Sequence, residues 1–288
     1  MDRVEVHGLS VAYRAMGTGA PVLLLHGWPT SSYLWRDVMA PIAEHNTVIA
    51  PDLPGFGRSS KPLDGYEFEF FDQVLDGFLD ALGITEVALA AHDLGGPIAL
   101  HWALHRQDRL SRLALLNTVA YPEFHPSAIA FVRGLVTPSR RAAMTSPEGL
   151  EQLMRQGVAN PAALGEEVIS AVQAPFDSEP ARLALAAAGV GLRASGFKEI
   201  ARLLPTLQAP VRIVYGAQDR LLPDIAETVA RLRIDLPQAE VTELPDAGHF
   251  IQEDAPAQVG MHLARFFAAS ASGMASGMAP TLRGGAGL

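Results

Sequence analysis

The 288-residue chain contains no cysteine, which excludes disulfides, thiolate metal ligands and a cysteine nucleophile. It has no excess of basic residues either, because 22 Lys and Arg stand against 31 Asp and Glu, a formal net charge of −9. Such a negative chain is unsuited to nucleic acid or to an anionic membrane surface. No apolar run reaches the roughly 20 residues that cross a bilayer. Because the absence of cysteine fits a reducing compartment, we expect a cytoplasmic protein.

The remaining composition is that of a large globular domain. Hydrophobic residues make up 49% of the chain and charged residues 18%, enough to bury a sizeable core. The N-terminal residues lack an apolar stretch preceded by positive charge, so we expect no signal peptide. Short β-rich runs alternate with helical patterns, which favours an α/β fold with a mostly parallel, eight-stranded sheet flanked by helices. We expect strands at 4–7, 10–14, 22–25, 47–50, 86–91, 112–116, 211–215 and 240–244, and principal helices at 32–44, 70–82 and 256–268.

The segment between the sixth and seventh predicted strands has a different texture, with helical pieces punctuated by prolines and no convincing strand. We therefore divide the chain into an α/β core (1–118 and 210–269), an inserted helical cap (119–209) and a tail (270–288). The cap would cover the carboxyl ends of the strands, where open α/β sheets bind ligands. The tail is rich in Gly, Ala, Ser and Met, and we predict it to be disordered.

Residues 87–100, VALAAHDLGGPIAL, are typical of a buried strand, a tight turn and an apolar helix, with Asp93 at the tip of the turn. Together with the small residues Ala91, Gly95 and Gly96, this is the pattern of a nucleophile elbow. Asp93 stands where such elbows usually carry serine. A carboxylate is already ionised at neutral pH and needs no base to become a nucleophile. The alternative is a loop dipeptide with no chemical role.

A carboxylate nucleophile can attack a saturated carbon and still be regenerated. A serine alkylated in this way would become an ether, which water does not readily cleave, whereas an alkylated aspartate is an ester. A base-activated water can attack that ester and release an alcohol. The residue type at position 93 therefore predicts hydrolysis at a carbon that bears a leaving group.

Two further residues match this topology in chain order. Asp219 follows the strand at 211–215 and His249 follows the strand at 240–244, so a nucleophile, an acid and a histidine occur in sequence. We predict His249 to be the general base for the hydrolytic water and Asp219 to hold its imidazole ring. The alternative is a structural role in turns for both residues. Asp224 and Asp246 are the nearest rival acids.

The turn at 25–29, LHGWP, supplies a third element. We predict that the backbone N–H groups of Trp28 and Leu94 form an oxyanion hole. The Trp28 indole could receive a leaving group or form an apolar wall of the pocket, and we favour the wall. Tyr121 and His125 are the other candidate donors to a leaving group, with a surface position as the alternative for His125.

Four segments together resemble the α/β-hydrolase superfamily, and within it the aspartate-nucleophile branch of haloalkane dehalogenases and epoxide hydrolases. They are HGWPTSSYLWR (26–36), PDLPGFGRS (51–59), HDLGG (92–96) and AGHFIQE (247–253). The resemblance implies an α/β-hydrolase fold and hydrolysis without cofactor or metal. It implies a haloalkane-dehalogenase-like enzyme that converts a small apolar organic substrate and water to an alcohol and halide. The alternatives are an epoxide hydrolase that forms a vicinal diol and a slow-turnover ligand-binding or sensory protein. We expect a monomer or a weak homo-oligomer.

The chain departs from this branch at the leaving-group donors. Dehalogenases of the branch carry a tryptophan directly after the nucleophile, where this chain has Leu94. Epoxide hydrolases use tyrosine hydroxyls from the cap. In this chain only Tyr121 lies at the edge of the predicted cap. Arginines of the predicted cap are expected on solvated helix faces. They are Arg133, Arg140, Arg141, Arg155, Arg182, Arg193 and Arg202.

Overall fold

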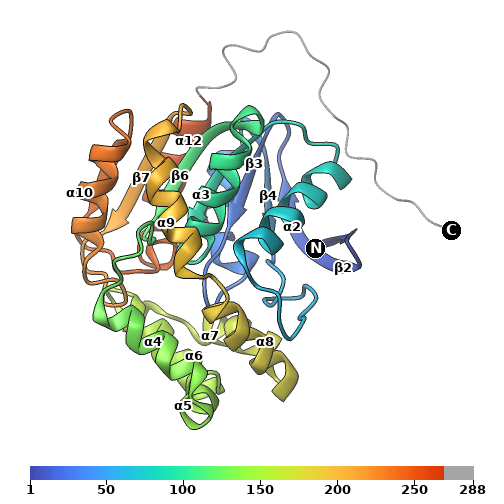
Figure 1. The fold of residues 1–288 in the computed structure, drawn as a ribbon, viewed down its shortest axis with the longest axis vertical. Helices are drawn as coiled ribbons and strands as arrows, with labels where there is room; N and C mark the ends of the chain where they lie inside the picture. The colour runs from blue at the N-terminus through green and yellow to red at the C-terminus, as the bar shows by residue number, and fades with distance from the viewer. Residues whose placement is uncertain (269–288) are drawn as a thin grey trace, which may run out of the picture.

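The computed structural model describes residues 1–268, so the predicted tail at 270–288 lies outside the described residues. Its sheet has eight strands in the order β1-β2-β4-β3-β5-β6-β7-β8 (Figure 1). The β1–β2 and β2–β4 pairs are antiparallel and all later pairs are parallel. The α/β-hydrolase fold predicted from the sequence is thus confirmed. The strands are β1 (Asp2–Val6), β2 (Leu9–Met16), β3 (Ala20–Leu25), β4 (Asn46–Pro51), β5 (Val87–His92), β6 (Leu110–Leu116), β7 (Val211–Gly216) and β8 (Glu240–Leu244).

The central strands are buried on both faces because their side chains alternate between two apolar layers. In β3, Leu23 and Leu25 join one hydrophobic cluster, while Val22 and Leu24 join the other. All four side chains are fully buried. A continuous apolar run therefore forms a strand that contacts helices on either side of the sheet.

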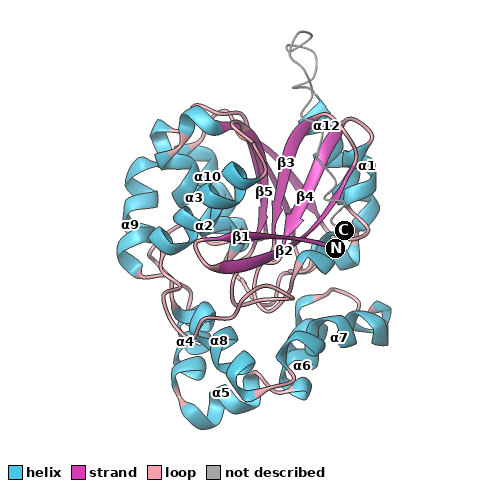
Figure 2. Cartoon of the chain, turned by 90° about the vertical axis from the view of Figure 1, so that its right-hand side faces the viewer, coloured by secondary structure: helices cyan, strands magenta, loops and turns pink. Residues whose placement is uncertain are grey.

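Helices cover the two faces of this sheet. Helices α2, α3, α9 and α10 lie on one face, and α1 and α12 lie on the other (Figure 2). The helices of the core are α1 (Met39–Ala43), α2 (Phe68–Ala81), α3 (Gly95–His105), α9 (Ala194–Leu203), α10 (Ile225–Asp235), α11 (Ile251–Asp254) and α12 (Pro256–Ala268). Short 3₁₀ turns complete the chain as η1 (Ser32–Trp35), η2 (Gln107–Arg109), η3 (Pro161–Ala163), η4 (Ala174–Phe176) and η5 (Leu204–Thr206). Within the described residues, no helix is long and apolar enough to cross a bilayer.

The helix predicted over 32–44 is wrong as a single element, because η1 and α1 are separate. Pro41 explains the interruption. Its ring has no N–H to donate to the carbonyl of Asp37 and would clash with that carbonyl in a continuous helix. Pro41 is tolerated in the first turn of α1, where an N–H has no intrahelical partner in any case.

A separate layer of helices lies beyond the carboxyl ends of the strands (Figures 1 and 2). It consists of α4 (Pro126–Val136), α5 (Pro138–Met144), α6 (Pro147–Gly157), α7 (Glu166–Gln173) and α8 (Glu179–Val190). Prolines begin α4, α5 and α6, since the first helical position loses nothing when it lacks an N–H. The prolines that set this segment apart in the sequence thus mark the starts of its helices.

Helix α9 belongs spatially to the core, although the sequence analysis placed residues 194–203 in the cap. It packs against α3 on the face of the sheet (Figure 1). Its buried residues Phe197 and Ile200 join the same hydrophobic cluster as the core strands. The helical layer over the site is therefore α4 to α8.

Candidate active site

Asp93 occupies the tip of the turn between β5 and α3 in a left-handed backbone conformation, with φ of 51°. That conformation is costly for a residue with a Cβ and is maintained only where the surroundings enforce it. Here the Asp93 carbonyl accepts hydrogen bonds from the Thr118 hydroxyl (2.7 Å) and the Gly96 amide (3.0 Å). Gly95 permits the close approach of strand and helix, because a Cβ there would lie 2.6 Å from the His26 carbonyl oxygen. The elbow predicted from the sequence is present.

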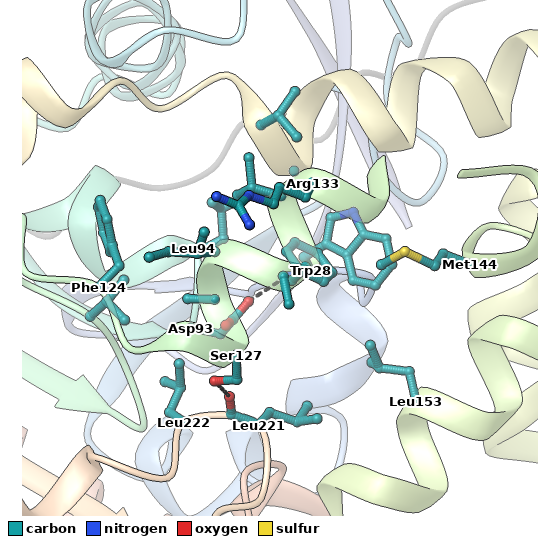
Figure 3. A pocket seen from close by; sticks show the side chains of 18 of the residues that line it. Trp28, Asp93, Leu94, Phe124, Ser127, Arg133, Met144, Leu153, Leu221 and Leu222 are labelled. Atoms are coloured by element: carbon teal, nitrogen blue, oxygen red, sulfur yellow. Dashed lines mark hydrogen bonds between the residues drawn. The ribbon is translucent and has the colours of Figure 1, made fainter. Parts of the chain in front are cut away.

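The Asp93 carboxylate is held at its two oxygens by different groups. The Trp28 amide donates to Oδ1 at 2.7 Å, and the Leu94 amide also donates to this carboxylate. These are the two backbone N–H groups that the sequence analysis assigned to an oxyanion hole. Oδ2 instead faces the imidazole Nε2 of His249 at 3.4 Å. The Asp93 side chain is 22% exposed, and its contact with Trp28 is seen at the edge of the cavity (Figure 3).

His249 and Asp219 meet as predicted, from the loops after β8 and β7. His249 Nδ1 contacts Asp219 Oδ2 at 2.8 Å, and both side chains are almost fully buried. The second oxygen of Asp219 accepts from the amides of Leu221 and Leu222, each at 2.8 Å. The rival acids Asp224 and Asp246 do not contact the imidazole, so the structure brings Asp219 to His249.

Burial and neighbouring charges have opposite effects on the pKa values of His249, Asp93 and Asp219. Burial alone would lower the pKa of His249, but the adjacent carboxylates of Asp219 and Asp93 raise it to about 10. Burial alone would raise the pKa values of Asp93 and Asp219, but hydrogen bonds and the charge of His249 hold both below their usual range. At neutral pH the site is therefore an imidazolium between two carboxylates.

Two residues that the sequence analysis left without a role support this group. The Asn117 amide donates to Asp219 Oδ2 at 2.8 Å, and its own oxygen accepts from the Gly216 amide at 3.0 Å. His92 Nε2 lies 2.9 Å from the His249 carbonyl, and burial lowers the pKa of His92 to about 4, so its neutral ring donates there. In the sequence, the only indication of these roles is that both residues are polar and lie at the carboxyl ends of β5 and β6.

An apolar cavity of about 890 Å³ opens in front of Asp93. It lies between the elbow and the helical layer, and Trp28, Leu94, Phe124, Met144 and Leu153 are among its walls (Figure 3). Apart from Asp93 and His249, the charged and polar side chains that line it are Ser127, Arg133, Gln152, Gln156 and Arg220. Such a cavity suits a small, largely apolar molecule with a polar group at one point.

The three leaving-group candidates from the sequence do not serve as donors in this cavity. The Trp28 indole N–H donates to the Leu185 carbonyl at 3.0 Å, so its ring forms a wall beside Phe131. The Tyr121 hydroxyl donates to Asp235 at 2.7 Å, and Tyr121 is not among the cavity-lining residues.

His125 is not a lining residue either, because its Nδ1 accepts from the Ser127 amide and caps α4. Arg133 was expected only on a solvated face. Its side chain is exposed, yet it also lines the cavity (Figure 3).

Three of the segments that carried the resemblance contribute structural contacts. Arg36 forms a bidentate pair with Glu253, each N–O distance being 2.7 Å, and so joins η1 to α11. Buried Asp52 accepts from the amides of Ser32 and Arg58 at 2.8 and 2.7 Å. These contacts fix loops around the site without reaching the cavity.

Comparison with known proteins agrees with this geometry. The model of the alpha/beta hydrolase fold family matches residues 20–256. The chain is 32% identical to "Haloalkane dehalogenase 2" of Mycobacterium tuberculosis over 86% of this chain and 88% of that protein. It is 39% identical to a soluble epoxide hydrolase of Corynebacterium sp., over 40% of each chain. The crystal structure of a haloalkane dehalogenase from Bradyrhizobium elkani superposes with a TM-score of 0.82 at 28% identity, covering 93% of this chain and 97% of that one.

A matching family model, a relative above 30% identity over most of both chains and an elbow with an aspartate at its tip all lead to one assignment. The chain belongs to the alpha/beta hydrolase fold family, as a hydrolase of the branch that holds haloalkane dehalogenases and epoxide hydrolases.

Proposed function

We propose that this hydrolase cleaves the carbon–halogen bond of a small apolar haloalkane through an alkyl ester on Asp93. The observation that supports this most directly is the unequal environment of the two Asp93 oxygens. Oδ1 is bound by the Trp28 amide, whereas Oδ2 is 3.4 Å from His249 and borders an apolar cavity. A carboxylate held in this way has one oxygen oriented for attack and one in a site built for an oxyanion.

In the first step, Asp93 Oδ2 attacks the halogen-bearing carbon. The carbon–oxygen bond forms with the electron pair of Oδ2, the carbon–halogen bond breaks, and the halide leaves with that bonding pair. No base is required, because the pKa of Asp93 lies below its usual value. An anionic nucleophile reacts faster where water solvates it poorly, as in an apolar cavity. The product is a neutral ester whose carbonyl oxygen is Oδ1.

In the second step, water attacks the ester carbon of Asp93 and His249 accepts the water's proton. The charge that develops on Oδ1 is stabilised by the amides of Trp28 and Leu94. Collapse of the tetrahedral intermediate breaks the bond to the alcohol oxygen, which takes a proton from His249. The carboxyl proton of Asp93 then passes to His249, which restores the resting imidazolium. The sum is haloalkane plus water to alcohol, halide and a proton.

Formation of the ester also prepares the base. In the resting enzyme the pKa of His249 is raised to about 10, partly by the charge of Asp93. The ester has no charge, so one of the two carboxylates that hold the proton on His249 is removed. The pKa of His249 then falls and the imidazolium releases its proton to solvent, so the neutral ring becomes able to accept a proton from water only after the nucleophile has reacted.

The donors available in the cavity favour halide over epoxide. None of the chain's five tyrosines, all in the described part, lines the cavity. An epoxide oxygen needs a proton donor as its ring opens. Arg133, Gln152 and Gln156 line the cavity with N–H groups, and such groups suit a halide that needs hydrogen bonds without a proton. The similarity to a soluble epoxide hydrolase keeps diol formation as the second candidate.

The experiment is a pair of product assays on matched panels of chloro- and bromoalkanes and terminal epoxides. We expect halide release by the wild type and none by Asp93→Ala. In His249→Gln, the first turnover should leave an alkyl adduct on the peptide containing Asp93, seen by mass spectrometry as the alkyl mass. Diol without halide would replace our proposal with the epoxide hydrolase. Tight ligand binding without product from either panel would favour a slow-turnover binding protein.

The proposal also covers the location of the protein in the cell and its oligomeric state. A chain without cysteine is suited to a reducing compartment, which supports a cytoplasmic location. We also retain the prediction of a monomer or weak homo-oligomer, which sedimentation velocity of the purified protein tests directly.

A further inference from the structure

A cluster of metal-ligand side chains lies at the second half of α3, away from the elbow at the amino end of this helix. His101 and His105 are one helical turn apart on α3, and Asp72 approaches from α2. Each of these three offers a ligand atom, and the three atoms lie within 4.8 Å of one another. Glu199 of α9 faces both histidines. Three helices that are distant in the sequence thus bring two imidazoles and two carboxylates together.

The hydrogen bonds of this cluster fix which ring nitrogens carry protons. His101 Nδ1 lies 3.0 Å from Asp72 Oδ2, and His105 Nδ1 lies 2.8 Å from the His101 carbonyl oxygen. A carboxylate and a carbonyl only accept hydrogen bonds, so both Nδ1 atoms are donors. In the neutral rings, both Nε2 atoms therefore present a lone pair.

Those two lone pairs point toward a third acceptor. His101 Nε2 is 3.7 Å from Glu199 Oε2, and His105 Nε2 is 3.5 Å from Glu199 Oε1. His101 is only 4% exposed, and its Nε2 has no hydrogen-bond partner among the described residues. Two imidazole lone pairs and a carboxylate that face one another repel unless a positive charge lies between them, either a metal ion or a proton on one of the rings.

We propose that His101, His105 and Glu199 bind a divalent transition-metal ion of the Zn²⁺ class, with Asp72 holding the His101 ring. Tetrahedral Zn²⁺ with bonds of about 2.0–2.1 Å places its ligand atoms about 3.3–3.4 Å apart. The separations of 3.5 and 3.7 Å are close to that spacing but end on the two different oxygens of Glu199, so the partly exposed Glu199 side chain must turn to bring one oxygen to both nitrogens. Imidazole ligands select Zn²⁺, Co²⁺ or Ni²⁺ over Mg²⁺ or Ca²⁺. A carboxylate behind a ligating histidine is the usual orienting partner.

The ion would act on structure rather than on the hydrolysis, for which no metal is expected. It would join α9 to α3 behind one wall of the cavity. Phe68 stacks on His101 with ring centroids 4.7 Å apart and packs edge-on against Phe197 at 5.3 Å, and Phe197 lines the cavity. The Glu199 side chain is 39% exposed, so solvent can reach the fourth coordination position.

The test uses untagged full-length protein that has been freed of metal by dialysis against chelator. Calorimetric titration with Zn²⁺ should give one saturable equivalent, and Co²⁺ should give the visible absorption bands of a tetrahedral site. His105→Gln and Glu199→Gln change partly exposed side chains and should each weaken the binding at least tenfold. His45→Gln, at an exposed histidine on another surface, is the matched control and should bind like the wild type.

Thermal unfolding tests for metal binding independently of the calorimetric titration. Saturating Zn²⁺ should raise the Tm of the wild type and of His45→Gln, and should leave that of His105→Gln unchanged, because only a folded-state site stabilises by mass action. Absence of saturable binding in the wild type overturns the proposal. So does wild-type affinity in both His105→Gln and Glu199→Gln. Neither result bears on Asp93, so the proposed hydrolysis stands or fails separately.

Discussion

Around Asp93, the floor of the cavity is held by hydrogen bonds from several loops, whereas the helical layer above it presents polar side chains with few partners. The Asp219 carboxylate, for example, accepts hydrogen bonds from two backbone amides and from the Asn117 side chain. Across the cavity, Arg133, Gln152 and Gln156 form no side-chain hydrogen bond or ion pair among the described residues.

This difference separates two tasks. A catalytic group must be held within a fraction of an ångström, so its neighbours are fixed by hydrogen bonds and burial. A surface that admits substrates of varying shape needs area and adaptable contacts, which apolar walls and unpaired polar side chains provide. We therefore expect changes in the floor to lower the rate for every substrate, and changes in the helical layer to alter which substrates react.

The largest effect should come from Asp219→Asn. The two backbone amides at 2.8 Å will bind the amide oxygen, so the new NH₂ must face both His249 and the Asn117 NH₂. Two donors then meet, and His249 is forced into the tautomer that cannot accept a proton from water. By analogy with other triads, kcat should fall about 10³–10⁴-fold. Steady-state halide release measures it.

The matched control is Asp224→Asn, at the nearby acid that Asp219 outcompetes for the imidazole. It should retain wild-type kcat. Equal losses in the two variants would mean that the floor tolerates no change of charge anywhere, and the special position of Asp219 would have to be abandoned.

A smaller effect is expected from Asn117→Ala, which removes one donor from a buried carboxylate. A hydrogen bond to a charged group contributes about 1.5–3 kcal/mol, so we expect kcat to fall about 10–100-fold. KM should be nearly unchanged, since Asn117 does not line the cavity. A rise in KM without a fall in kcat would show that Asn117 shapes the cavity rather than positioning Asp219.

Arg133→Met tests the other side of the comparison. Arg133 lines the cavity without a partner, so we expect loss of its guanidinium to lower kcat by about 2–5-fold, the value of one exposed charge interaction, and to weaken inhibition by added halide. Arg140→Met is the control, because Arg140 is exposed on α5 and does not line the cavity. If both variants match the wild type, the helical layer contributes shape alone.

The sequence predicts the floor of the cavity better than it predicts the helical layer. Asp93, Asp219 and His249 were predictable because each lies in the loop that follows a strand, and parallel strands bring their carboxyl ends together whatever else the chain does. The positions of the Trp28 and Leu94 amides beside Asp93 follow from the same topology. The structure agrees with the apolar wall favoured for Trp28, but the acceptor of its indole N–H, a carbonyl 157 residues away on α8, could not be predicted.

Tyr121 and α9 were misjudged for a related reason. Tyr121 lies near the start of the cap in the sequence, but its hydroxyl binds Asp235 at the end of α10. Helix α9 follows the cap along the chain but packs on α3. Neither contact leaves a periodic trace in the sequence, because each depends on how elements dock. The Asp72–His101–His105–Glu199 cluster escaped notice in the same way, as only the two histidines share an element.

The smallest predicted effect concerns the pH dependence of stability. The pKa of His249 is raised from 6.5 to about 10, so the folded state binds this proton more tightly than the unfolded state. The resulting stability is complete below about pH 6.5 and is lost as pH rises through about 10. Asp93 and Asp219 have lowered pKa values, so both stay ionised over this range and contribute no change of their own.

Thermal unfolding from pH 7 to 10 therefore isolates the imidazolium. The Tm of the wild type should fall by a few degrees more than that of His249→Gln over this interval, because the variant has no proton to lose between the two carboxylates. Parallel curves would mean that His249 is already neutral in the resting enzyme. In that case ester formation would not be needed to free the base, and the floor would be ready for the second step before the first had begun.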